Sequence, residues 1–149
     1  MRSFQGLAQV YDRLMNHVDF GLFTEFYLQA VTRYSGKINK ILDLACGTGG
    51  ILLELLRRGY AVTGLDISEE MLALADQKIY QAGFVPSLTC QDMREFSLHG
   101  TVDLVLCAFD SLNYLLKKND LKKVFSRVHR VLVPGGVFAF DVNSEYKVK

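Results

Sequence analysis

The sequence predicts an α/β fold in which helices cover both faces of a mostly parallel sheet, a three-layer αβα sandwich. In the stretch 40–53, KILDLACGTGGILL, an apolar run leads into glycines and then directly into a helical pattern. A second β-like run, residues 60–65, ends at Asp66. A third run, residues 102–109, is apolar except at Asp103, as expected for a parallel strand covered on both faces.

The size and composition of the chain indicate one ordinary globular domain. Its 149 residues can bury a substantial core, half of them are hydrophobic and 22% are charged. The formal net charge of +1 predicts no broad basic field for nucleic acid. No apolar run approaches the length of a membrane span and we find no signal peptide, so we expect a cytoplasmic protein without membrane contact.

The cysteines suggest neither a disulfide framework nor a metal site. Cys46, Cys90 and Cys107 are odd in number, far apart and placed inside apolar runs. We therefore expect buried, reduced thiols.

Residues 1–36 are expected to form a helical cap, and residues 37–149 the core of this single domain. A loose helical pattern of apolar residues covers 7–14, and a clearer one covers 23–34. Gly36 follows the second pattern, and we expect it to end that helix.

Helices and strands continue to alternate after Asp66. Ser68 can cap a helix whose first turn is acidic, which suits the positive end of the helix dipole. Gly83 is expected to close this helix. Residues 86–91 then predict a third strand.

The last part of the chain predicts one more helix and one more strand. Apolar residues at helical spacing cover 121–131, and a Leu-Val-Pro-Gly-Gly turn leads into a strand at 137–142. A basic cluster surrounds the start of the helix, made of Lys117, Lys118, Lys122 and Lys123. Most such clusters are solvated faces, although a ligand that carries phosphate could use this one.

The glycine turn and Asp66 together predict a site for a ligand that contains a nucleoside. Glycine takes positive φ and has no Cβ, so a flat ligand can approach the backbone closely at Gly47 and Gly49. The following helix directs free N–H groups to the same place. Asp66 ends the next strand, where open parallel sheets bind ligands, and its carboxylate can accept both hydroxyls of a ribose.

The turn differs from the two common phosphate-binding patterns. Leu52 stands where a dinucleotide fingerprint would have its third glycine, and the Gly-Lys-Ser/Thr ending of a phosphate loop is absent. Asp43, four residues before Gly47, would repel a pyrophosphate but suit a cation. Both features disfavour a nicotinamide-dependent oxidoreductase, which we keep as the least favoured alternative.

The pattern Asp43-x-x-x-Gly47-x-Gly49, with Asp66 ending the next strand, resembles the class I S-adenosylmethionine-dependent methyltransferases, which have a Rossmann-like fold. Their cofactor has no phosphate, carries an α-amino group and a sulfonium, and keeps a ribose diol. One acid near the amino acid end and one at the ribose therefore suit it. The resemblance covers residues 11–142, is specific for the cofactor and does not identify the substrate.

This resemblance implies a set of cofactor-binding residues along the chain. It places Tyr11 at the methionine end of the cofactor, although a tyrosine that only packs its helix fits equally well. Ile67 and Met71 would sandwich the adenine, and Met71 can also pack its own helix. The full set implied is Tyr11, Asp43, Ala45, Gly47, Gly49, Asp66, Ile67, Met71, Asp92, Met93 and Phe109.

The third strand is followed by Gln-Asp-Met, which resembles the third motif of the family. There the carboxylate accepts a hydrogen bond from the adenine amino group, and the next backbone N–H meets the ring. The resemblance thus gives these roles to Asp92 and Met93. The alternative is that Asp92 is an ordinary loop acid.

The segment after the fourth strand is where the acceptor meets the methyl group in the family. An Asn-Pro-Pro-Tyr motif, which marks amino-group methylation of bases or glutamine, is absent, and Ala-Phe-Asp-Ser-Leu-Asn-Tyr looks like the small-molecule and tRNA-modifying branches. We therefore predict a methyltransferase for a small-molecule or tRNA acceptor, with Asp110, Asn113 and Tyr114 as candidates for steering it. The alternative is a binding module without catalysis.

The resemblance also implies the sheet order 3-2-1-4-5 and a longer chain. The family ordinarily continues with a helix and two more strands, whereas this sequence stops seven residues after Val142. The apolar strand 137–140 would then be an unpaired edge, which invites pairing with another chain. We expect a truncated methyltransferase that lacks the usual last two strands. A second copy would cover its fifth strand, giving a homodimer, or the bare strand would destabilise the domain.

Overall fold

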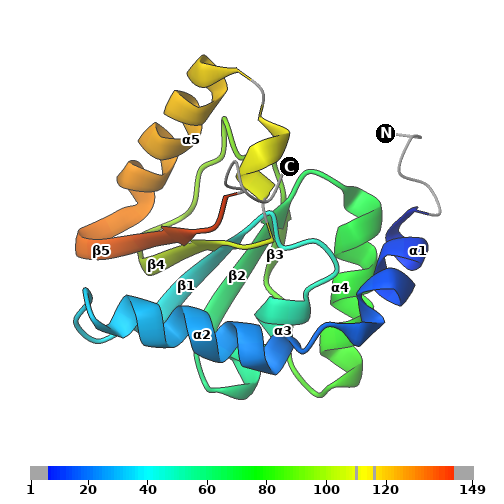
Figure 1. Ribbon diagram of the computed structural model, residues 1–149. Coiled ribbons are helices and arrows are strands. Elements are labelled where there is room, and N and C mark those ends of the chain that lie inside the picture. Colours follow the sequence, from blue (N-terminus) through cyan, green and yellow to red (C-terminus); the bar gives the residue numbers. More distant parts are fainter. Residues whose placement is uncertain (1–6, 110, 116, 143–149) are drawn as a thin grey trace, which may run out of the picture.

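Five parallel strands form one sheet in the order β3-β2-β1-β4-β5 in the computed structural model, which describes residues 7–109, 111–115 and 117–142 (Figure 1). The α/β fold and the strand order 3-2-1-4-5 that the sequence predicts are both confirmed. The strands are β1 (Lys40–Leu44), β2 (Ala61–Asp66), β3 (Leu88–Cys90), β4 (Val102–Cys107) and β5 (Leu132–Phe140).

Helices lie on both faces of this sheet, so the molecule has three layers. Figure 1 shows α2 and α3 on one face and α5 on the other. Ala75 and Ile79 of α4 join the core on the side of α2 and α3. The helices are α1 (Leu7–Leu14), the 3-10 turn η2 (Met15–His17), α2 (Phe20–Thr32), α3 (Gly50–Arg57), α4 (Glu69–Gln81), the 3-10 turn η3 (Ser111–Tyr114) and α5 (Lys118–Val131). None of the helices in the described part of the chain is long and apolar enough to cross a membrane.

The central strands divide their side chains between two hydrophobic cores. In β1, Ile41 joins the core under α2, α3 and α4, whereas Leu42 joins the core under α5. In β4, Leu104 and Val105 divide in the same way. This alternation follows from the period of two along a strand, and it explains why the sequence of a doubly covered strand is apolar throughout.

Helix α2 belongs to the same core as the helices that follow the first strand. Its buried residues Tyr27, Leu28 and Val31 pack in one cluster with residues of α3 and α4. The division into a cap at 1–36 and a core at 37–149 stays a prediction.

Capping residues set the ends of α4 as expected. The Ser68 hydroxyl accepts a hydrogen bond from the N–H of Met71 at 3.2 Å, and Gly83 follows the helix with a φ of +92°. The N–H of Phe84 then donates to the carbonyl of Ile79 at 3.1 Å, which satisfies one of the last free carbonyls of the helix.

Two segment ends differ from the sequence prediction. Helix α2 ends at Thr32, before Gly36, because the N–H groups of Tyr34 and Ser35 both bond to the carbonyl of Val31 and tighten the last turn. The strand expected at 137–142 is β5, which begins at Leu132 and ends at Phe140.

The Pro-Gly-Gly segment lies inside β5 as an irregularity, because the register against β4 shifts there. Leu132 pairs with Val102, and the next pair along is Val137 with Leu104. A bulge of this kind absorbs extra residues while the strand continues.

The cysteines differ in part from the expectation of buried thiols. Cys107 is buried and Cys46 is half-buried, but Cys90 is exposed because β3 is a short strand at the edge of the sheet.

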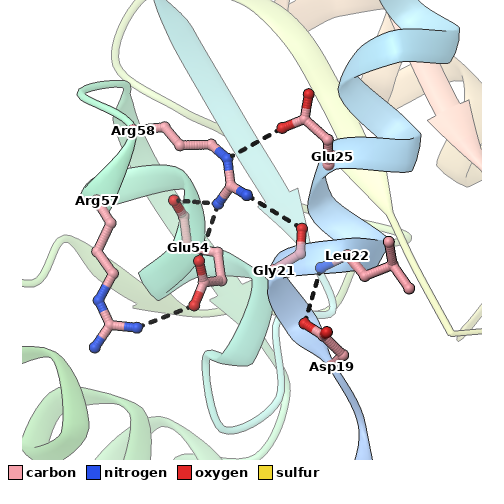
Figure 2. A network of polar contacts seen from close by, with 7 residues as sticks. All are labelled: Asp19, Gly21, Leu22, Glu25, Glu54, Arg57 and Arg58. Atoms are coloured by element: carbon pink, nitrogen blue, oxygen red, sulfur yellow. Dashed lines mark hydrogen bonds and ion pairs between the residues drawn. The ribbon is translucent and has the colours of Figure 1, made fainter.

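Arg58, just after α3, joins this helix to α2 (Figure 2). Its guanidinium donates to the Glu54 carboxylate at 2.9 Å and to the carbonyl of Gly21 in α2 at 3.1 Å. Glu25 of α2 lies 3.6 Å from the same guanidinium. Arg57, in contrast, reaches only Glu54 of its own helix, at 3.0 Å, among the described residues.

We expect Arg58→Ala to lower the free energy of unfolding by about 1 kcal/mol, because it removes contacts that join two helices. Arg57→Ala is the matched control and should cost only about 0.3 kcal/mol, the value of an exposed pair within one helix. Urea unfolding of both variants measures the difference. Equal losses would contradict the interpretation that Arg58 holds α2 against α3.

Candidate functional site

A cavity of about 520 Å³ opens at the carboxyl ends of β1, β2 and β4. Chain connections from β1 and β4 leave the sheet in opposite directions at this edge, which is where open α/β sheets bind ligands. Helices α1 and α2 each add an aromatic residue to its wall. The cavity is lined by Tyr11, Phe20, Asp43, Ala45, Cys46, Gly47, Thr48, Gly50, Ile51, Asp66, Ile67, Ser68, Met71, Met93, Ala108, Phe109 and Ser111.

Two glycines of the turn after β1 have different tasks. Gly47 lines the cavity with a φ of +58°, so its backbone faces any ligand there. Gly49 has a φ of +85° and does not line the cavity. A Cβ at Gly49 would lie 3.1 Å from the Cβ of Ala75, so this glycine lets α3 begin close against α4.

Among the described residues, two that are not glycine also have positive φ, and both line the cavity. Ala45, after β1, has a φ of +61°, and Phe109, after β4, has a φ of +58°. Such conformations cost about 1–3 kcal/mol each and cluster at functional sites. The rings of Phe20 and Phe23 in α2 pack edge-on against Phe109, with centroids 5.7 and 5.2 Å away. Helix α2 therefore holds one wall of the cavity in its strained shape.

The Asp66 carboxylate is fixed by two backbone N–H groups. Gly47 donates to one oxygen at 2.9 Å, and Ser68 donates to the other at 2.9 Å. The carboxylate thus joins the glycine turn to the start of α4. Each oxygen has a further lone pair, so the group can also accept hydrogen bonds from a ligand in the cavity.

Asp43 is a buried acid, only 3% exposed, and it lines the same cavity. Its carboxylate makes no hydrogen bond with the residues that the structure describes. Burial, together with the negative charge of Asp66, raises the pKa of Asp43 from 3.8 to about 8. A buried carboxyl without a protein partner calls for a hydrogen-bond donor or a cation from the cavity.

Helix α1 is tied to the glycine turn by a polar contact that the sequence did not reveal. The Thr48 hydroxyl donates to the Asp12 carboxylate at 3.0 Å, and the Lys78 ammonium of α4 donates to the same oxygen at 2.8 Å. This contact places α1 beside the cavity, where Tyr11 is part of the wall.

On the side of β2 and β3, apolar side chains form the wall. Ile67, Met71 and Met93 line the cavity there. Asp92 does not line it, because its carboxylate is held by the guanidinium of Arg94, with the closest contact at 2.6 Å. Hydrogen bonds from Arg94 lower the pKa of Asp92 despite the opposing effect of burial.

The residues expected to steer an acceptor lie after β4. Asp110 lies outside the described residues. Asn113 and Tyr114 belong to η3, with their side chains outside the description. Ser111 lines the cavity and donates to the carbonyl of Ala108 at 2.8 Å.

The structure brings together most of the residues that the sequence placed at the cofactor. Gly49 and Asp92 are the two that do not line the cavity. Those that line it are Tyr11, Asp43, Ala45, Gly47, Asp66, Ile67, Met71, Met93 and Phe109. Thr48 and Ser68 were missed, although both stand next to predicted residues. Phe20 gave no local signal, because it comes from a helix that precedes the first strand.

Residues 41–136 match the family described as methyltransferase domain. The chain therefore belongs to this family, and together with its fold it is a class I S-adenosylmethionine-dependent methyltransferase domain.

Relatives cover almost all of this chain but are longer than it. YqeM of Bacillus subtilis (strain 168), which is named as a methyltransferase, is 45% identical over 146 residues. The match covers 97% of this chain and 57% of YqeM. The crystal structure of an S-adenosylmethionine-dependent methyltransferase from Clostridium acetobutylicum ATCC 824 is 36% identical with a TM-score of 0.84, and the match covers 97% of this chain and 59% of that one. CalS10 of Micromonospora echinaspora, an amino pentose methyltransferase solved with its cofactor bound, is 26% identical with a TM-score of 0.80, over 91% and 56% of the two chains.

The raised pKa of Asp43 predicts that stability falls as the pH rises. The folded state keeps the proton up to about pH 8, whereas the unfolded chain releases it near the ordinary pKa of 3.8. Between these values the unfolded state binds fewer protons, so the free energy of unfolding falls by at most about 1.4 kcal/mol per pH unit. Asp43→Asn cannot titrate and should gain stability relative to the wild type as the pH rises from 5 to 8.

Urea unfolding of both proteins at each pH gives this difference, in which the titration of all other groups largely cancels. A difference that stays constant across the range would contradict the assignment. Asp66→Asn serves as a second variant: without the charge of Asp66, the pH window should end at a lower pH, while the effect of burial remains.

Proposed function

We propose that this domain binds S-adenosylmethionine in the cavity and presents its methyl group to a small-molecule or tRNA acceptor. The observation that carries the proposal is the pair of acids in the cavity wall. Asp66 is held at the end of β2 with lone pairs to spare, and Asp43 is buried at the end of β1 without a partner among the described residues. A ligand with a diol at one end and an ammonium at the other satisfies both.

The parts of the cavity have separate tasks in this proposal. Asp66 would accept the ribose hydroxyls, and Asp43 would stabilise the α-amino group as the carboxylate. Ile67 and Met71 would hold the adenine, beside the backbone of Met93. The Asp92 carboxylate already accepts hydrogen bonds from Arg94. It has further lone pairs, so in this proposal it would accept the adenine amino group as well.

The chemistry requires little from the protein beyond placement. When bound, S-adenosylmethionine would supply an electrophilic methyl group on a sulfonium whose leaving group is a neutral thioether, and the cavity residues would hold that methyl group in line with the acceptor. Orientation of this kind can lower a barrier by up to roughly 7–11 kcal/mol. The strained backbone at Phe109 fixes the wall beside η3, where Asp110, Asn113 and Tyr114 are our candidates for steering the acceptor.

We expect calorimetric titration with S-adenosylmethionine to give saturable binding. Asp66→Ala should weaken it at least about tenfold, because each charge-assisted hydrogen bond to the ribose is worth about 1.5–3 kcal/mol. Asp76→Ala, which removes an exposed acid of α4 outside the cavity wall, is the matched control and should bind like the wild type.

The same titration decides between the alternatives. Binding without turnover on any acceptor would favour a module that has no catalysis of its own. Binding of NAD but not of S-adenosylmethionine would sink the proposal. A thermal melt of Asp66→Ala without ligand checks that the variant still folds, since Asp66 also holds the glycine turn.

We also propose that a second copy of the chain pairs with the edge of β5 that the described strands leave unpaired. Among the described residues β5 pairs only with β4, and its aromatic residue Phe140 is 39% exposed. An exposed strand edge with apolar side chains is a template for pairing.

Light scattering over a series of concentrations tests this pairing. The wild type should approach twice the mass of one chain at high concentration, and Phe140→Lys should stay at the mass of one chain, because a charge beside the edge opposes pairing. A thermal melt checks that this variant still folds without the contact between Phe140 and Phe125 of α5. A wild type that keeps the mass of one chain at every concentration would refute the proposed dimer.

A further inference from the structure

A second concave surface, of about 680 Å³, lies between α5 and the segment after β3. Its lining is basic: Arg94, Lys122, Lys123, Arg127 and Arg130, with Glu95 and one serine. We call this surface the basic groove. It shares no lining residue with the cofactor cavity, yet it adjoins it, since Met93 lines the cavity and Arg94 lines the groove.

Helix α5 turns three different faces to its surroundings. Val124, Val128 and Val131 are buried against the sheet. On one flank Phe125 packs against two rings of β5, with centroids 5.5 and 5.6 Å away. The other flank faces the segment between β3 and β4, which rises beside α5 in Figure 1, and this flank is basic.

The cations of the groove differ in whether the protein already neutralises them. Arg94 binds Asp92 at 2.6 Å and lies 3.5 Å from Asp120 at the start of α5, so it joins the two walls. The other four, Lys122, Lys123, Arg127 and Arg130, form no ion pair with any residue that the structure describes. The groove therefore presents an excess of positive charge, although the whole chain has a net charge of only +1.

The shape of the groove indicates what kind of anion fits it. From Lys122 to Arg130 the cations extend over about 12 Å of helix, at a rise of about 1.5 Å per residue. This length exceeds a single phosphate or a pyrophosphate and suits a row of phosphates along a chain. None of the described residues that line the groove is aromatic, so they offer no platform on which bases could stack.

We propose that the basic groove binds the phosphate backbone of a nucleic acid without reading its sequence. Cations on a flank of a helix position a strand through its phosphates, and sequence is read elsewhere. A strand held there lies next to the cofactor cavity across the segment that carries Met93 and Arg94. Binding of the phosphate backbone does not depend on the function proposed above. The further step, in which the bound strand is the methyl acceptor, does rest on that function.

Fluorescence anisotropy with a labelled single-stranded RNA 20-mer, and with DNA of the same sequence, tests the proposal. We expect dissociation constants on the order of 10⁻⁴–10⁻⁶ M near physiological salt. A plot of the logarithm of the association constant against the logarithm of the salt concentration should have a slope of about −2.8, the value for four phosphate contacts to a single strand. Lys122→Gln/Lys123→Gln should weaken binding about tenfold and bring the slope to about −1.4. The proposal is supported if the protein binds the RNA more tightly than the DNA, or binds the two with equal affinity.

The matched control removes two positive charges elsewhere. Arg33→Gln/Lys37→Gln changes exposed residues near the end of α2, outside the groove, and should bind RNA like the wild type. Equal weakening by both double variants, no binding by the wild type, or equally tight binding of pyrophosphate would overturn the proposal. Calorimetry with S-adenosylmethionine should be unchanged in Lys122→Gln/Lys123→Gln, so a failure of the groove is distinguishable from a failure of the cofactor site.

Discussion

The burial of one carboxyl group close to another in the cavity wall is the constraint on which the site depends. Asp43 is the last residue but one of β1 and Asp66 is the last of the neighbouring parallel strand β2, so both lie at the same edge of the sheet. The protein neutralises them unequally. Asp66 receives two backbone hydrogen bonds, whereas burial and the charge of Asp66 hold the proton on Asp43 to about pH 8. Because burial is the larger cause of this raised pKa, a cation bound beside Asp43 would favour its carboxylate form.

The rest of the fold keeps this pair in place. The turn after β1 can donate to Asp66 because Gly47 takes a left-handed conformation, and α3 can begin at once because Gly49 has no Cβ to strike Ala75. From the other side, α2 packs its aromatic rings against Phe109 and is itself fastened to α3 by Arg58. Segments distant in the sequence thus converge on one cavity.

The positive charges of this protein are concentrated on one surface, although its net charge is small. The chain as a whole is nearly neutral, and from composition alone no nucleic acid surface is expected. Helix α5 nevertheless collects its cations on one flank, while Arg94 from the segment after β3 completes the groove. That segment separates the groove from the cofactor cavity, so two ligands of opposite charge could lie on its two sides, the cationic donor at Met93 and a polyanion at Arg94.

By itself the sequence determined the alternation of strands and helices, the glycine turn and the two acids, because periodicity, positive φ and strand ends are local properties. Only the tertiary structure decided which side chains meet. Phe20 reaches the cavity through the packing of α2, Asp12 of α1 accepts a hydrogen bond from Thr48 of the glycine turn, and the Pro-Gly-Gly segment becomes a bulge inside β5 because the register with β4 absorbs it. These outcomes depend on contacts between distant segments, and such contacts leave no local signal in a single sequence.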